Sequence, residues 1–275
     1  MRSILLLAFL PAAMAAAPAL AIVRPVIAQS DGGDGLPAAF KHVAGETLFF
    51  SCNISGFTKS AQNQINVAYS VQAFDPKGIP VGQIYKNESK EEVGPQDKDW
   101  MPKIEDQVVL PDILQPGSYK IVVKAEDLIA KTSADLTVPF EVNGRDVKSS
   151  PTLIAKDFRW YHNDGEERAL NPPLYHPGDN MFMKFDITGY KYGANNKVDI
   201  SYVASLVLED GKTIWTQPEP ALEQSESYYP RPYVEGEFGI SLNKDFKPGT
   251  YTMAVDVKDA AGKQNYQGKF QFTVQ

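Results

Sequence analysis

The sequence predicts an all-β chain that consists of two tandem antiparallel β-sandwiches, each with about seven strands. Two observations support this prediction. Two copies of one pattern make up nearly the whole chain of 275 residues. Inside each copy apolar and polar residues alternate, and turn signals that contain Gly, Pro or Asp recur about every 8–12 residues. Each copy is long enough to bury a core of its own.

The duplication becomes visible when the chain is aligned with itself. The segment VAGETLFFSCNISGF, which begins at Val43, aligns with HPGDNMFMKFDITGY, which begins at His176. One residue is then lost, and QPGSY at Gln115 aligns with KPGTY at Lys247. Such long copies indicate a duplicated domain and not a solenoid of short repeats.

The alternation within each copy has the period of a strand that rests one face on a core. Helical spacing is absent after the first residues. In copy two the strands are expected to begin near Leu153, Met181, Val198, Thr213, Glu237, Thr250 and Lys269.

A Pro-Gly-x-Tyr turn leads into the sixth strand of each copy, with Tyr119 in the first and Tyr251 in the second. This arrangement resembles the tyrosine corner of immunoglobulin-like and fibronectin-III-like sandwiches. Both tyrosines are therefore expected to be structural, with the ring in the core and the hydroxyl bonded to the preceding loop. The chain as a whole resembles bacterial extracytoplasmic tandem modules of this type. The resemblance covers both copies and implies a display, spacer or adhesion module without a particular ligand.

The chain begins with MRSILLLAFLPAAMAAAPALA, which has the layout of a secretory signal peptide. A retained membrane anchor is the less favoured alternative. Small residues permit cleavage after Ala21 or after Ala28. The duplication favours Ala21, because the segment from Leu20 aligns with the first strand of copy two from Leu153. Ile22 would then begin the first strand of the mature chain.

These patterns divide the chain into a signal peptide (1–21), a first sandwich (22–143), a linker (144–151) and a second sandwich (152–275). Gly and Ser residues loosen the linker, while Pro151 stiffens its end. We expect an elongated pair of domains with limited hinge motion.

Charge and cysteine content restrict the class of protein. The net charge of −7 is spread over both halves, so neither a nucleic-acid surface nor an acidic tail is indicated. Cys52 is the only cysteine, which excludes an intrachain disulfide in an exported chain. It lies on an apolar strand face, and we expect it to be a buried structural residue.

Candidate chemistry is sparse. The three histidines His42, His162 and His176 do not have metal-ligand spacing, and no catalytic or nucleotide-binding motif occurs. Asp127 and Asp259 occupy matching positions after the sixth strand, where an Asp caps a turn or, as a weaker alternative, binds calcium. We expect no cofactor, no metal and no catalysis.

The two copies differ most in the loop before the fifth strand, and loops of a shared scaffold are where function diverges. In copy two this region is rich in Tyr, Trp and Arg, the residue types that anchor binding surfaces. The candidate binding residues are Trp215, Tyr228, Tyr229, Arg231 and Tyr233. The alternative is that these aromatic residues fold back over their own sandwich.

Together these features predict a non-catalytic exported module of the bacterial envelope, periplasmic or extracellular, that acts in protein binding or adhesion. It is expected to be monomeric, with an unknown protein or glycan partner, without nucleic acid and without a membrane span in the mature chain. The alternatives are a carbohydrate-binding protein that uses the Tyr/Trp/Pro loop and, less favoured, a secreted protease inhibitor.

Overall fold

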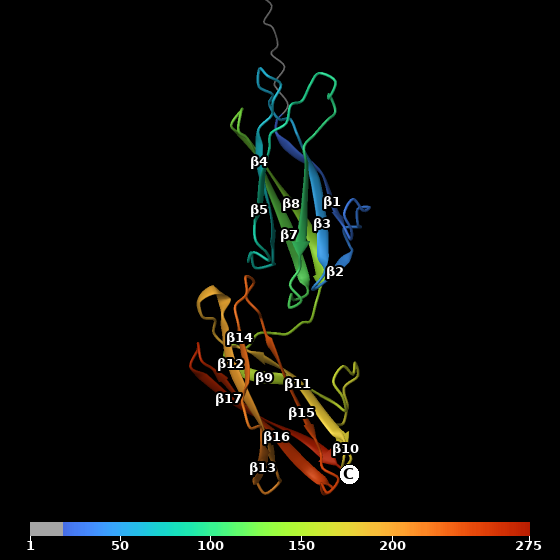
Figure 1. The fold of residues 1–275 in the computed structure, drawn as a ribbon, viewed down its shortest axis with the longest axis vertical. Coiled ribbons are helices and arrows are strands. Elements are labelled where there is room, and N and C mark those ends of the chain that lie inside the picture. Colours follow the sequence, from blue (N-terminus) through green and yellow to red (C-terminus); the bar gives the residue numbers. More distant parts are fainter. Residues whose placement is uncertain (1–18) are drawn as a thin grey trace, which may run out of the picture.

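The computed structural model describes residues 19–275, and two β-sandwiches lie end to end along its long axis (Figure 1). The predicted all-β class is therefore confirmed. A 3-10 turn at Ala194–Asn196 is the one helical element in the described part of the chain. That part contains no helix with the length and apolar character needed to cross a membrane. The predicted signal peptide lies almost wholly outside the described residues.

The first sandwich, domain 1, packs a three-stranded sheet in the order β1-β3-β6 against a five-stranded sheet in the order β2-β8-β7-β4-β5. All neighbours are antiparallel except β2 and β8, which are parallel. The strands are β1 (Ala21–Ala28), β2 (Lys41–Val43), β3 (Thr47–Ser55), β4 (Val67–Phe74), β5 (Tyr85–Ser89), β6 (Lys103–Val109), β7 (Gly117–Asp127) and β8 (Thr132–Asn143).

The second sandwich, domain 2, repeats this topology. Its small sheet has the order β15-β11-β9, and its large sheet has the order β10-β17-β16-β12-β13, with β14 also paired to β12. The strands are β9 (Ile154–Tyr161), β10 (Leu174–Tyr175), β11 (Asn180–Thr188), β12 (Val198–Val207), β13 (Thr213–Thr216), β14 (Ala221–Ser225), β15 (Val234–Ser241), β16 (Gly249–Asp259) and β17 (Gln264–Val274).

Among the described residues domain 1 has eight strands and domain 2 has nine, compared with about seven expected in each copy. The seven strands expected in copy two are all present. The additional ones are β2, β10 and β14, which are two to five residues long. Two or three residues cannot display a period of two, so β2 and β10 leave no alternation in the sequence.

Each domain has its own core, because the alternating residues bury one face of each strand. Every second residue of β3 is buried, and so is every second residue of β12. Two separate clusters of buried side chains result, one for each domain. Among the described residues the one exception to this separation is Tyr229, a residue of domain 2 that belongs to the cluster of domain 1.

The segment aligned with the first strand of copy two forms strand β1, in the register that the duplication predicted. Both first strands carry a register shift at matching positions, and a left-handed residue lies in each: Arg24 with φ 54° and Asp157 with φ 52°. Leu20 just before β1 is also buried, at 8% exposure.

If a signal peptide is cleaved from the chain, we expect the mature chain to begin at Ile22, because cleavage after Ala28 would remove β1, uncover the edge of β3 and expose part of the core. Intact-mass measurement of the exported protein identifies the first residue. A stable monomer that begins at Gln29 would contradict the requirement for β1. A chain that begins at Leu20 would show that the buried Leu20 side chain is retained as well.

Both predicted tyrosine corners have the expected bond. The Tyr119 hydroxyl donates to the carbonyl of Gln115 at 2.9 Å, and the Tyr251 hydroxyl donates to the carbonyl of Lys247 at 2.8 Å. Both rings are buried in the core of their domain. Each tyrosine therefore ties the loop before its strand, β7 or β16, to the core.

Tyr251→Phe is expected to lower the free energy of unfolding by about 1 kcal/mol, because the ring remains and one buried hydrogen bond is lost. Denaturant unfolding measures the change. Tyr228→Phe is the matched control, since the Tyr228 side chain is half exposed and should change stability by less than about 0.5 kcal/mol. Equal stability of Tyr251→Phe and wild type would remove the structural role of the hydroxyl.

Cys52 is buried in domain 1 at 1% exposure, as expected from its position on β3. Burial raises the pKa of its thiol to about 12, which leaves almost no reactive thiolate at neutral pH. We expect a thiol reagent to label Cys52 only after denaturant unfolds domain 1. Rapid labelling of the native chain, followed by mass spectrometry, would contradict this.

Candidate functional site

The Tyr-rich loop of domain 2, residues 226–233, lies at the junction between the two sandwiches. It connects β14 with β15 at the end of domain 2 that faces domain 1. The segment 144–153, which joins β8 to β9 and contains the linker, crosses the same junction. Four of the five candidate binding residues therefore lie at the junction between the two domains.

Tyr229 crosses from domain 2 into domain 1. Its ring is 7% exposed and packs with the domain 1 core. Its hydroxyl donates to Asp75 Oδ2 at 3.0 Å. Asp75 Oδ1 in turn accepts the backbone N–H groups of Lys77 at 2.9 Å and Ile79 at 2.7 Å, so the carboxylate is held by the turn after β4. Tyr229 thus finds a fixed, preformed acceptor in the neighbouring domain.

The surroundings keep the two tyrosine hydroxyls at this contact protonated. Burial, with the Asp75 carboxylate as the next cause, raises the pKa of Tyr119 to about 12. The same two causes raise the pKa of Tyr229 above its ordinary value. Both groups therefore remain hydrogen-bond donors at any physiological pH.

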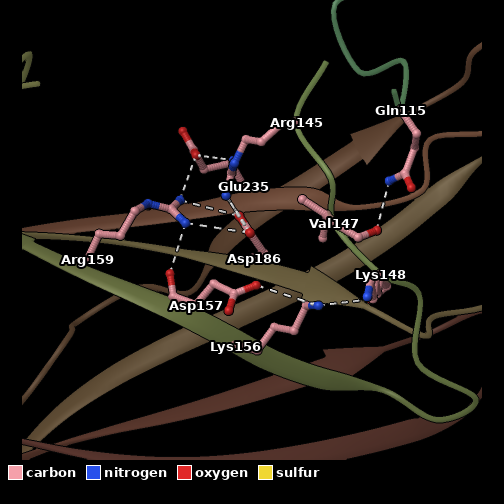
Figure 2. Close-up of polar contacts among 9 residues, drawn as sticks. All are labelled: Gln115, Arg145, Val147, Lys148, Lys156, Asp157, Arg159, Asp186 and Glu235. Carbon is pink, nitrogen blue, oxygen red and sulfur yellow. Dashed lines mark hydrogen bonds and ion pairs between the residues drawn. The ribbon is translucent and has the colours of Figure 1, made fainter. Parts of the chain in front are cut away.

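The linker is fastened to domain 2 by Arg145. Its guanidinium forms an ion pair with Asp186 on β11 and another with Glu235 on β15, the latter at 2.9 Å (Figure 2). Arg159 on β9 contacts the same carboxylates at 3.3 and 2.8 Å. The Asp186 side chain is only 1% exposed, so two cations surround a buried anion. Arg145 also lies over the ring of Tyr233, 5.1 Å from its centroid.

The linker is fastened to domain 1 as well. Gln115 Nε2 donates to the carbonyl of Val147 at 2.7 Å, and Val147 is 2% exposed. On the other side, Lys156 Nζ donates to the carbonyl of Lys148 at 2.9 Å (Figure 2). Gly144 passes so close to domain 1 that a Cβ there would lie 2.0 Å from the carbonyl oxygen of Leu114. Gly144 therefore permits a close approach, where the sequence suggested looseness.

The rest of the Tyr-rich loop is held against domain 2. The carbonyl of Arg231 accepts the hydroxyls of Tyr190 at 2.5 Å and Tyr192 at 2.6 Å. The guanidinium of Arg231 donates to Glu223 Oε1 at 2.7 Å. The Thr188 hydroxyl donates to the carbonyl of Pro232 at 3.2 Å. These contacts fix the loop that carries Tyr229.

The structure brings four of the five candidate binding residues together. Tyr229, Arg231 and Tyr233 are engaged at the junction, and Tyr228 beside them is 51% exposed. Trp215 is separate, because it lies on β13, which pairs with the end of β12 that is far from the junction. Its ring packs against Phe238, with the two ring centroids 5.6 Å apart. A cleft of about 380 Å³ at the junction is lined by Asp75, Pro76, Tyr119, Tyr192, Tyr229 and Pro230, among others.

Sequence reasoning missed the residues that receive this loop. Asp75, Arg145, Asp186, Tyr190 and Tyr192 were not recognised as parts of one site. One signal was present in the duplication. Tyr192 aligns with Lys59 of copy one, so it is an aromatic residue that the shared scaffold does not require.

The two matching aspartates cap turns. Asp127 accepts the backbone N–H groups of Thr58 at 2.6 Å, Ile129 at 2.9 Å and Ala130 at 3.1 Å. Burial raises the pKa of Asp127, but these donors outweigh burial and hold the pKa below its ordinary value. Asp259 likewise accepts the backbone N–H of Gly262 at 2.9 Å. Within residues 19–275 no cluster of three or more metal-ligating side chains occurs.

No family model matches this chain, and no curated protein matches it in sequence. Among solved structures it is similar to the C-terminal domain of the Streptococcus agalactiae AgI/II polypeptide BspA. That match has 11% identity, covers 92% of this chain and 100% of the other, and has a TM-score of 0.32. The C-terminal domain of the Streptococcus pyogenes antigen I/II-family protein AspA gives 10% identity, 92% and 99% coverage and a TM-score of 0.32. The likeness is distant, and nothing about ligand or function follows from it.

Proposed function

We propose that this chain is a non-catalytic, exported module of a bacterial envelope, in which two sandwiches form a stiff spacer that presents a protein-binding surface. The observation that supports the stiff spacer is the junction. Tyr229 enters the core of the neighbouring domain, and Arg145 and Val147 hold the linker to both sides. A junction with buried contacts of this kind opposes the relative domain motion that is otherwise expected.

A distance measurement tests the spacer. Cys52→Ser removes the one native thiol, and Asn87→Cys with Lys212→Cys places a spin label on an exposed site of each domain. We expect pulsed electron paramagnetic resonance to give one narrow distribution of distances between the labels. A broad distribution that resembles two freely jointed domains would contradict the proposal.

A carbohydrate-binding role through the Tyr-rich loop has little free surface. Tyr229 and Tyr233 are each 7% exposed, so Tyr228 is the loop tyrosine that a sugar could reach. A glycan array tests this alternative with wild type and Tyr228→Ala. Specific binding that Tyr228→Ala abolishes would favour a glycan partner over a protein. A protease panel tests the inhibitor alternative in the same way.

A further inference from the structure

The free edge of β17 in domain 2 is the second surface of interest. β17 pairs along its whole length with β16, but its other edge pairs only at the end, where Leu174 and Tyr175 of β10 match Thr273 and Val274. The Thr273 N–H donates to the carbonyl of Pro173 at 3.1 Å, so the backbone of Thr273 faces away from β16.

The backbone groups of Gln271 and Lys269 face the same way as those of Thr273. In an antiparallel pair, residues alternate between those bonded to the partner and those that face outward, and the β16–β17 register has no shift. Within residues 19–275 no backbone partner is found on that side of Gln271 or Lys269. Two residues of this strand therefore present unpaired N–H and C=O groups.

A groove accompanies this edge. It has a volume of about 770 Å³ and lies between β9 and β17. About half of its wall consists of aromatic and aliphatic side chains and the other half is polar. Among the described residues that line it, Lys269 is the one that carries a charge. The lining side chains that matter here are Phe158, Trp160, Leu170, Phe270 and Lys269.

In domain 1 the corresponding strand edge, that of β8, is protected against further strand pairing. Its last strand, β8, pairs with β2 in the same parallel manner, and the Ala44 N–H donates to the carbonyl of Asn143 at 3.1 Å. The position of β8 that aligns with Gln271 of β17 also faces outward, and it is occupied by Pro139. Proline has no N–H and protects an edge strand against pairing. The first-strand positions that align with Phe158 and Trp160 are Pro25 and Ile27, which are not aromatic.

We propose that the β17 edge of domain 2 binds an extended peptide of a partner protein as an added strand, and that this peptide alternates apolar side chains with at least one carboxylate. The unpaired backbone groups would supply the hydrogen bonds, and the aromatic groove would take the apolar side chains. Lys269 selects a carboxylate. The proposal deepens the binding part of the proposed function, but the spacer can be correct without it.

Charge also distinguishes this occupant from a second copy of the chain. If β17 of two copies paired antiparallel with the pair centred on Lys269, the two Lys269 side chains would face each other, and like charges across a strand pair are unfavourable. A partner strand with a carboxylate at that position has the opposite sign. The charge of the groove therefore favours a different protein over self-association.

The test uses the full exported chain and a short fluorescent peptide that alternates Val with Thr and carries a central Glu. We expect saturable binding in fluorescence anisotropy, and about tenfold weaker binding of the same peptide with a central Lys. A peptide methylated on alternate backbone nitrogens should also bind at least about tenfold more weakly, because it cannot complete the strand pairing.

Variants of the chain locate the site. Gln271→Pro should fold, because domain 1 carries proline at this register, and should weaken binding about tenfold or more. Gln271→Ala keeps the N–H and should bind like wild type, whereas Lys269→Glu should reverse the preference for Glu over Lys. Circular dichroism checks the folding of each variant. If Gln271→Pro does not fold, the methylated peptide decides the question alone.

Three outcomes would overturn the proposal. One is the absence of saturable binding to wild type. Another is equal affinity of the methylated and unmethylated peptides. The third is a wild-type dimer in analytical ultracentrifugation that Gln271→Pro converts to a monomer, because a second copy would then occupy the edge. A narrow label distribution with any of these results would leave the spacer standing and remove only the peptide site.

Discussion

Tyr229→Ala is expected to uncouple the two domains and to destabilise domain 1, although the residue belongs to domain 2. The substitution removes a buried ring from the domain 1 core and the hydrogen bond to Asp75. Truncation of a large buried aromatic residue costs about 3–5 kcal/mol. Here that cost is divided between the free energy of unfolding of domain 1 and the free energy with which the two domains contact each other. Calorimetry should show a lower midpoint for domain 1, and the label-to-label distance distribution should broaden.

The adjacent tyrosine gives a matched control. Tyr228→Ala changes the same residue type in the same loop, but its side chain is half exposed, so stability should change by less than about 0.5 kcal/mol. Tyr229→Phe separates the two contributions, since it keeps the ring and loses only the hydrogen bond to the Asp75 carboxylate, which contributes about 1.5–3 kcal/mol. If Tyr229→Ala and Tyr228→Ala behaved alike, Tyr229 would not be the link between the domains.

Asp186→Ala is expected to destabilise domain 2 by about 3 kcal/mol. The change leaves Arg145 and Arg159 beside each other without the buried anion between them, and removal of one partner from a buried ion pair is costly. The value is at the low end of the usual range because both arginines reach water, with side chains 39% and 24% exposed. Denaturant unfolding of domain 2 measures the change.

Glu235→Gln is the comparison for Asp186→Ala, because Glu235 contacts the same two arginines from a side chain that is 39% exposed. Water replaces a lost exposed ion pair, so the expected cost is below about 1 kcal/mol. An equal effect of the two substitutions would mean that burial of Asp186 does not determine its contribution. Asp186→Ala should also loosen the linker, although the contacts of Arg145 with Glu235 and of Lys156 with Lys148 remain.

The duplication made much of the fold predictable. A strand pattern written twice provides an internal check, and it gave the correct register of β1 even through its irregularity at Arg24. The tyrosine corners were predictable for a similar reason, since the bond to a carbonyl four residues away is local. Local geometry and a period of two are both properties that a sequence displays directly.

The junction was not predictable in the same way. Its contacts join residues far apart in the chain: Tyr229 to Asp75, and Arg145 to Asp186. Residue type indicated that Tyr229 would be an anchor, but an aromatic residue in a loop buries itself equally well against its own domain, a neighbour or a partner. Only the position of domain 1 decides among these. The short strands β2 and β10 escaped detection because they have too few residues to show a period.

The end-to-end arrangement in Figure 1 has a mechanical consequence. The C-terminus lies at the end of domain 2 that is far from domain 1, and β1 begins at the end of domain 1 that is far from domain 2. A force that pulls these ends apart would act along β1 and β17 rather than across them. The hydrogen bonds of β1 to β3, and of the parallel pairs β2–β8 and β10–β17, would be strained together in shear, not opened one after another like a zipper. We expect each domain to withstand tension better than its thermal stability alone would indicate, and single-molecule stretching measures that resistance directly.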